Sequence, residues 1–117
     1  MATDRETVNE LVAIMTAAAG CAVRAKAMFG GHGLYADDLF FAIIVDGVVY
    51  LKVDDRNRGD FLALGSAAFR PFDDEREMNY FPIPEVIWTD ERALADWTAR
   101  SLAVADDAKG KKKSRKR

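Results

Sequence analysis

The fold is decided by residues 39–53, which read LFFAIIVDGVVYLKV. Two runs of β-branched, aromatic and aliphatic residues, 39–45 and 48–53, flank the dipeptide Asp46-Gly47. An Asp-Gly pair between two such runs is a strong short-range signal for a β-hairpin, because both residues accept the positive φ angles of a type I′ turn. We therefore predict an antiparallel hairpin here and an antiparallel sheet around it.

Three further short strands are predicted on either side of this hairpin. Residues 21–29 alternate apolar and polar side chains, which is the period of a half-buried strand. Residues 69–72 and 78–81 flank a polar stretch and are expected to pair with each other, with Pro71 at an edge or a bulge. The sheet is thus expected to have about five strands, within the usual size range of sheets.

Two longer helices are predicted near the ends of the chain. The first follows a capping-box pattern at Thr3–Glu6 and ends at Gly20, which offers a left-handed stop. Its apolar residues recur three and four apart and form one face; they are Val8, Leu11, Val12, Met15, Ala18 and Ala19. The last helix is expected from residue 89 or 90 to Ala105.

A short, weak helix is predicted between the hairpin and residue 69. Asp54 or Asp55 can cap it and Gly65 can end it. The apolar residues expected on its inner side are Phe61, Leu62 and Leu64. The complete prediction is a single α+β domain with the order α-β-β-β-α-β-β-α, an antiparallel sheet and flanking helices.

The composition bounds the class of protein. The 117 residues are 50% hydrophobic and 31% charged, which is typical of one compact domain that needs no metal or disulfide. Cys21 is the single cysteine and is expected to be a small buried residue. No apolar run reaches the roughly 20 residues that span a bilayer. The amino terminus lacks the basic-then-apolar order of a signal peptide, so we expect a cytoplasmic protein without a membrane partner.

The charge is distributed unevenly along the chain. Residues 109–117 hold seven of the 17 basic residues and no acid, which leaves ten basic and 19 acidic residues, a net charge of −9, for the rest. We predict an acidic domain at 1–108 and a disordered basic tail at 109–117, because the tail has no apolar residue to bury.

The basic tail is a candidate contact for nucleic-acid phosphates. Seven phosphate contacts would give a dependence of log affinity on log salt with a slope of about −6. The candidate residues are Lys109, Lys111, Lys112, Lys113, Arg115, Lys116 and Arg117. Two alternatives remain open: a solubilising end that folds back on the acidic surface, or a tail without a role.

Residues 28–35, MFGGHGLY, form the most conspicuous local motif. Three glycines within four residues permit close approach of a ligand or another backbone, but the spacing of a phosphate-binding loop is missing. A tight connection between strands is therefore the favoured interpretation. His32 is the only histidine and is expected to be exposed, without partners for a metal site. A small-ligand or enzymatic site that uses His32 and Tyr35 stays open as an alternative, and no cofactor is expected.

The aromatic residues of the second half allow two interpretations. Tyr80, Phe81, Trp88 and Trp97 could include a stacking platform for bases, but cations are missing around them in the sequence. Packing in the core or at an interface is therefore favoured. The acidic pairs at 37–38 and 54–55 coincide with a predicted turn and a predicted helix start, where local hydrogen bonding explains them.

Read together, these segments are similar to the amino-terminal domain of the TfoX/Sxy family of competence regulators. The resemblance covers about residues 23 to 102, and the last of its characteristic residues are Leu94 and Trp97 in the last helix. Its most specific residues are Met28, Phe29, Gly30, Gly31, Gly33, Leu34 and Tyr35, followed by the segments 41–44, 50–54 and 78–85.

The resemblance implies an α+β fold without catalytic residues. Family members with assigned roles act as positive regulators of DNA-uptake genes, by assisting an activator of the cyclic-AMP receptor type at promoters. We therefore expect a non-enzymatic interaction domain with a protein partner such as a transcription activator, weak nucleic-acid contact through the tail, and a homodimer as a further option. Those regulators carry a second, helical domain, whereas a Lys/Arg-rich segment follows the matching region here.

Overall fold

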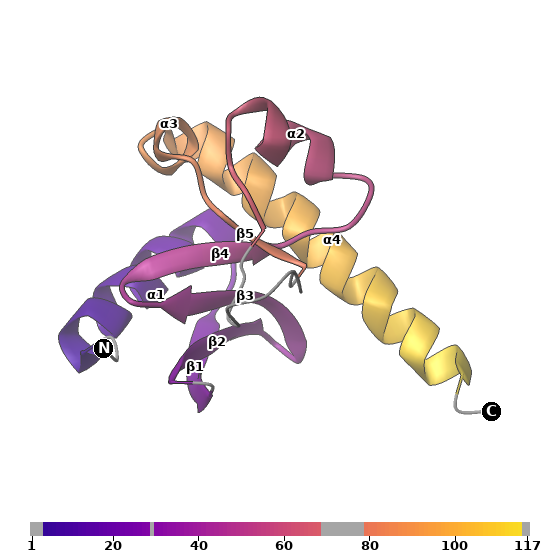
Figure 1. Ribbon diagram of the computed structural model, residues 1–117. Helices are drawn as coiled ribbons and strands as arrows, with labels where there is room; N and C mark the ends of the chain where they lie inside the picture. Colours follow the sequence, from indigo (N-terminus) through magenta and orange to yellow (C-terminus); the bar gives the residue numbers. More distant parts are fainter. Residues whose placement is uncertain (1–3, 29, 69–78, 116–117) are drawn as a thin grey trace.

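The computed structural model of the chain describes residues 4–28, 30–68 and 79–115, with side chains through residue 110. Its elements are, in order, α1 (Arg5–Ala19), β1 (Val23–Met28), β2 (Gly31–Ala36), β3 (Leu39–Val45), β4 (Val48–Lys52), α2 (Arg58–Ala63), β5 (Tyr80–Pro82), α3 (Glu85–Trp88) and α4 (Glu91–Arg115), all shown in Figure 1.

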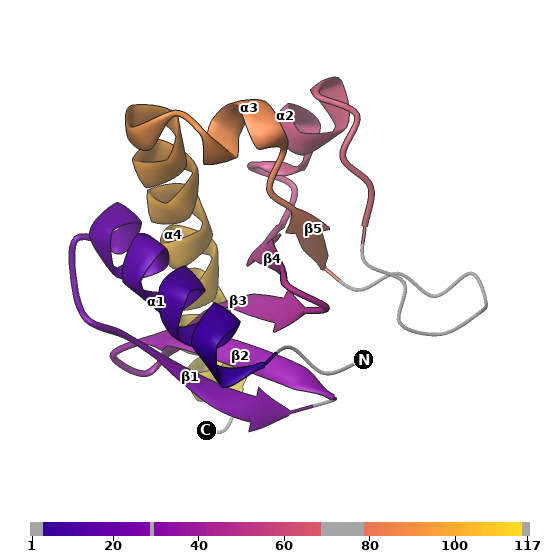
Figure 2. The same ribbon diagram turned by 90° about the vertical axis from the view of Figure 1, so that its left-hand side faces the viewer.

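The strands of the described residues form one antiparallel sheet in the order β1-β2-β3-β4-β5, so that each strand pairs with its neighbour in sequence. Helices α1 and α4 pack together on one face of this sheet (Figure 2). The predicted α+β class and the antiparallel sheet of five strands with flanking helices are confirmed.

The hairpin at residues 39–53 forms as its sequence predicts. Val45 is paired with Val48, and the two residues between them have positive φ, 50° at Asp46 and 77° at Gly47. Both angles are those that a type I′ turn requires. The acidic pair at 37–38 also forms a turn, between β2 and β3, with Asp37 at φ 55°.

The predicted order of elements is wrong at the glycine-rich segment. Residues 31–36 form the regular strand β2, so four strands and not three precede α2. Glycine is uncommon in strands in general. Gly31 is needed here because a Cβ at this position would lie 2.2 Å from the carbonyl oxygen of Ile44. Strands β2 and β3 approach closely at this glycine, and no local sequence pattern shows this. For this reason a strand was found where a connection was predicted.

Strand β5 completes the sheet by pairing with β4, with Lys52 opposite Tyr80 and Leu51 opposite Phe81. The expected strand at 69–72 and its pairing with residues 78–81 lie outside the described residues. Pro82 is the last residue of β5, at the edge of the sheet, where a missing backbone donor is tolerated.

The core lies between the sheet and the helices α1 and α4. Val8 and Met15 of α1 are buried, as the helical spacing predicts. The core residues that the strands contribute are Val23, Leu34, Ala36, Phe41, Ala42, Ile44, Val49, Leu51 and Phe81. The N-cap of α1 is Asp4, whose carboxylate accepts a hydrogen bond from the backbone N–H of Thr7 at 2.8 Å. This hydrogen bond lowers the pKa of Asp4.

The short helix α2 begins later than predicted. Its N-cap position is Asn57, and the Asp54 carboxylate instead accepts from the backbone N–H of Arg56 at 2.9 Å, in the turn before the helix. Of the predicted inner residues only Phe61 is buried, at 1% exposure, whereas Leu62 and Leu64 are 54% and 47% exposed. The prediction failed for these two because a helix of six residues buries only a narrow stripe.

Helix α4 is longer than predicted. It begins after Asp90, whose carboxylate accepts from the backbone N–H groups of Arg92 and Ala93 at 3.1 Å. It ends at Arg115 and not at Ala105, so the backbone of residues 109–115 is helical where the sequence analysis expected disorder. Apolar periodicity stops near residue 105, but lysine, arginine and alanine continue a helix at little cost. The boundary between a domain and a tail at residue 108 stays a prediction.

Candidate interaction surface

The glycine motif is part of the hairpin between β1 and β2. Gly30 lies at the turn with φ 75°, and Leu34 is completely buried in the core. A Cβ at Gly33 would lie 2.6 Å from Cε of Met28 and 2.9 Å from Cε1 of Phe40. Gly31 and Gly33 therefore allow the strands and their side chains to pack closely. Phe29, also in the motif, lies outside the described residues.

His32 lies in strand β2, where it is paired with Ala27 and Ile44. It is half-buried, and its buried Nδ1 atom has no hydrogen-bond partner within the described residues. The prediction that it is exposed was wrong, because the segment is a strand and not a loop. In the part of the chain that the structure describes, no group of three or more His, Cys, Asp or Glu residues could hold a metal ion.

Cys21 is exposed, which corrects the prediction that it is buried. It follows the left-handed Gly20 that ends α1 and precedes the first residue of β1, Val23. The side chain therefore lies in a connecting turn, which has neither a helix face nor a strand face to bury it.

The sheet face opposite α1 and α4 is the strongest candidate for an interaction surface, and we call it the aromatic face. Side chains alternate between the two faces of a sheet, so the register of the strands decides which residues share it. Its residues include Arg24, Lys26, Met28, Tyr35, Phe40, Ile43, Tyr50, Lys52 and Tyr80. Two of these, Ile43 and Tyr80, are buried but lie outside the main core cluster, which occupies the other face.

A row of rings and cations crosses this face. The Arg24 guanidinium lies 4.8 Å from the centre of the Tyr35 ring. Tyr35 stacks on Phe40 with a centroid distance of 5.0 Å and an interplanar angle of 18°, and Phe40 lies 5.7 Å from Tyr80. The amino group of Lys52 lies 5.8 Å from the Phe40 ring and 5.5 Å from the Tyr80 ring. Both cations are within the distance of a cation–π contact.

The prediction that cations are missing around Tyr80 was therefore wrong. Lys52 is 28 positions earlier in the sequence, but the pairing of β4 with β5 places it directly opposite Tyr80. Tyr35, Phe40 and Arg24 were missed as parts of one surface for the same reason, because each comes from a different strand. No spacing in the sequence could have indicated this row.

Burial changes the pKa values of three groups on the aromatic face. It raises the pKa of Tyr50, and the nearby Asp46 raises it further. The pKa of Lys52 is lowered by burial. The pKa of Tyr80 is raised to about 12, mainly by burial and further by the nearby Tyr35. For Lys52, burial is the one cause of the lowered pKa.

A Tyr80→Phe variant should lose less stability than the parent in strongly alkaline solution. Between pH 10 and about 12 the tyrosine ionises in the unfolded chain but not in the folded one, so the parent loses stability as the pH rises through this window. Urea unfolding at a series of alkaline pH values measures this. If the free energy of unfolding fell equally with pH in the two proteins, the assignment of the raised pKa to Tyr80 would be contradicted.

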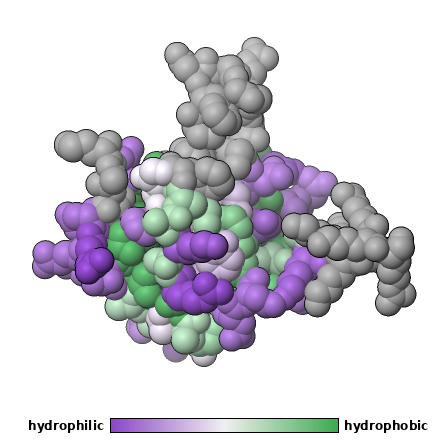
Figure 3. Space-filling view, turned by 90° about the horizontal axis from the view of Figure 1, so that it is seen from below, coloured by the Kyte–Doolittle hydropathy of each residue, from purple (hydrophilic) through white to green (hydrophobic). Residues whose placement is uncertain are grey.

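The strands carry basic residues without acidic ones. Arg24, Lys26 and Lys52 all project from the aromatic face, and none of the strand residues that the structure describes is an aspartate or a glutamate. Seen from below, on the side where β1 and β2 lie, hydrophobic surface is interspersed with hydrophilic side chains (Figure 3). A domain with an excess of acids thus has one sheet face that is basic and aromatic.

Lys109 is the one predicted phosphate-binding residue whose side chain the structure describes. It forms an ion pair with Asp38 in the turn between β2 and β3. For this residue the contact agrees with the alternative in which the basic segment folds back on an acidic turn. The side chains of the other six candidates lie outside the described residues.

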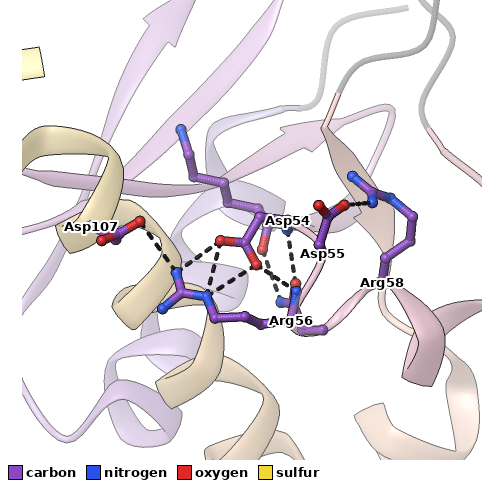
Figure 4. Close-up of polar contacts among 7 residues, drawn as sticks. Asp54, Asp55, Arg56, Arg58 and Asp107 are labelled. Carbon is purple, nitrogen blue, oxygen red and sulfur yellow. Dashed lines mark hydrogen bonds and ion pairs between the residues drawn. The ribbon is translucent and has the colours of Figure 1, made fainter. Parts of the chain in front are cut away.

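The acidic residues at 54–55 belong to a network of ion pairs (Figure 4). The Arg56 guanidinium contacts Asp54 at 2.8 Å and Asp107 of α4 at 3.8 Å, and Arg58 pairs with Asp55. These pairs are exposed to solvent, so each contributes little to stability. They join the turn before α2 to the far half of α4, and local hydrogen bonding explains the acidic pair as predicted.

Comparison with known proteins identifies a family. Residues 16–105, more than half of the chain, match the family model described as the TfoX N-terminal domain. No curated protein matches the chain. Among the helices of the described residues, none has the length and apolar character that crossing a membrane requires.

Proposed function

We propose that this chain, which belongs to the TfoX N-terminal domain family, is a non-enzymatic interaction domain that takes part in transcription regulation in the cytoplasm. Its partners in this proposal are a transcription activator and, through the basic residues at its carboxyl end, the phosphates of DNA. The family match over residues 16–105 is the observation that carries the proposal. The structure supports the non-enzymatic part of the proposal, because His32 and Tyr35, the residues of the enzymatic alternative, lie on opposite faces of the sheet.

The residues of the enzymatic alternative do not converge. His32 pairs with Ala27 and lies on the helix-covered face, whereas Tyr35 pairs with Arg24 and lies on the aromatic face. Two side chains on opposite faces of one sheet cannot act on the same substrate atom. This separation counts against a catalytic or ligand-binding role of the glycine motif and favours a domain that works by surface contact.

The contact with DNA rests on the charge of the basic segment. Helix α4 continues through residue 115, so residues 109–115 extend the helix, and residues 109–117 carry seven cations in the sequence. Such a segment binds duplex phosphates without reading bases, because Lys and Arg at this density contact the backbone of any sequence.

Neutralising the basic segment should abolish binding to duplex DNA. The variant is the full chain with all seven cations replaced by glutamine, which keeps the helix propensity of the segment. The parent is expected to bind duplex DNA with a log–log salt slope of about −6, and the variant to bind negligibly. Fluorescence anisotropy at several salt concentrations measures both. Equal, negligible binding by the two proteins would remove the DNA contact from the proposal.

A further inference from the structure

The aromatic face has the composition of a second contact surface, apart from the basic segment. We propose that it binds single-stranded nucleic acid, with Arg24, Lys26 and Lys52 contacting phosphates and with Tyr35 and Phe40 packing against bases. This goes beyond the proposed function, which assigns nucleic-acid contact to residues 109–117 and to duplex DNA.

Charge complementarity selects a polyanion as the occupant. Apart from the basic segment the chain has a net charge of −9, yet the aromatic face carries three cations and, in its described strands, no acid. Arg24 and Lys26 are exposed and lie two residues apart on the edge strand β1, so they point to the same side. A ligand that carries a negative charge at every repeat matches this row of cations.

Lys52 adds a cation that has no carboxylate partner among the described residues. It is half-buried and its amino group contacts the rings of Phe40 and Tyr80 instead. Burial of an unpaired charge is unfavourable, and the lowered pKa of Lys52 has this cause. A phosphate at this position would supply a counter-charge that the described residues do not provide, so the charge of Lys52 would favour binding of a polyanion.

The rings favour a single strand over a duplex. Tyr35 and Phe40 stack on each other across β2 and β3 and remain partly exposed. Aromatic side chains between cations are typical of surfaces that bind unpaired bases, because every base has a face that can stack. A duplex hides these base faces and would use only the cations. A polypeptide of acidic residues alone has no aromatic ring to stack on these rings.

The test measures the affinity of a labelled oligothymidylate and of a labelled duplex by fluorescence anisotropy. All proteins carry the glutamine substitutions in residues 109–117, so that a failure here is distinct from a failure of the proposed function. In this background we expect single-stranded binding that exceeds duplex binding about tenfold, since base packing contributes roughly 1–3 kcal/mol per base.

The charge variant combines Arg24→Gln with Lys26→Gln, and its matched control combines Arg5→Gln with Arg92→Gln, two exposed cations on α1 and α4. The control removes the same net charge away from the aromatic face. The charge variant should lose about tenfold in affinity, and its salt slope should flatten by about 1.4, which is 0.7 for each lost contact with a single strand. Equal losses in variant and control would overturn the proposal.

The ring variant is Tyr35→Leu, with Tyr35→Phe as the conservative replacement. Leucine should weaken single-stranded binding at least about fivefold, whereas phenylalanine should keep it, because the contact needs the ring and not the hydroxyl. Equal affinities for the leucine variant and the parent would overturn the proposal. A competition experiment with poly-glutamate gives a second test. Equal displacement of the oligonucleotide from the parent and from the leucine variant would also overturn the proposal.

Lys52→Met keeps the test decisive where a leucine at Tyr35 prevents folding. Methionine retains the apolar stem of Lys52 and removes the half-buried charge, so the thermal midpoint should rise while affinity for the single strand falls several-fold. A change in stability without a change in affinity would contradict a role of Lys52 in binding.

Discussion

Replacing Gly31 with alanine is expected to destabilise the protein by about 3 kcal/mol or more. A Cβ at this position would lie 2.2 Å from the carbonyl oxygen of Ile44, and backbone atoms of a central strand cannot move aside as a flexible side chain can. Strands β2 and β3 must separate to accept the methyl group, which weakens the middle of the sheet. Urea unfolding followed by far-UV circular dichroism measures the loss.

Gly59→Ala is the matched control for this experiment. Gly59 lies in helix α2, its φ is not positive, and a Cβ there would meet nothing within 4 Å. Alanine should therefore raise stability by about 0.5–1 kcal/mol through its better helix propensity. A Gly31→Ala protein as stable as the parent would show that β2 and β3 do not approach as closely as this geometry states.

The second large effect is expected for Phe61→Ala, with a loss of about 3–5 kcal/mol. Phe61 is 1% exposed and is the one residue of α2 that is buried. Its ring lies 4.5 Å from that of Trp97 and 5.5 Å from that of Phe81. It therefore joins α2 to α4 and to the sheet, and a cavity here removes the buried apolar contact of α2.

Leu62→Ala, one position further along the helix, is the control. Leu62 is 54% exposed, so its truncation should change stability by no more than about 0.5 kcal/mol. The loss at Phe61 is a large fraction of the roughly 5–15 kcal/mol that holds a typical domain folded. Similar losses at both positions would mean that α2 packs with a different face toward α4.

Local features of the fold were predictable from the sequence, and features that depend on a second strand were not. The Asp46-Gly47 turn was predicted correctly because its signal is local: two residues that accept positive φ join two strand-forming runs. The start of the last helix at residue 89 or 90 was predicted from local sequence as well, and in the structure α4 begins directly after Asp90. By contrast, the glycines at 31 and 33 were interpreted as a connection, because the close approach of β3 that requires them is not a property of their own segment.

The candidate surface depends even more on tertiary structure. Arg24, Tyr35, Phe40, Lys52 and Tyr80 come from five strands, and only the register of those strands brings them into one row. The sequence allows Tyr80 to be part of a stacking platform but favours a packing role, because it shows no cation around this residue. The nearby cation was on another strand.

The amino-acid sequence by itself determined the α+β class, the central hairpin, the apolar face of α1 and the family, because these depend on local backbone preferences and on motifs of contiguous residues. Only the tertiary structure decided that residues 31–36 of the glycine motif form a strand, that Phe61 is the one buried residue of α2, and that cations and rings share the face that α1 and α4 leave uncovered. The physical reason is that strand pairing joins residues far apart in the chain, and the free energy of those contacts is absent from any single segment.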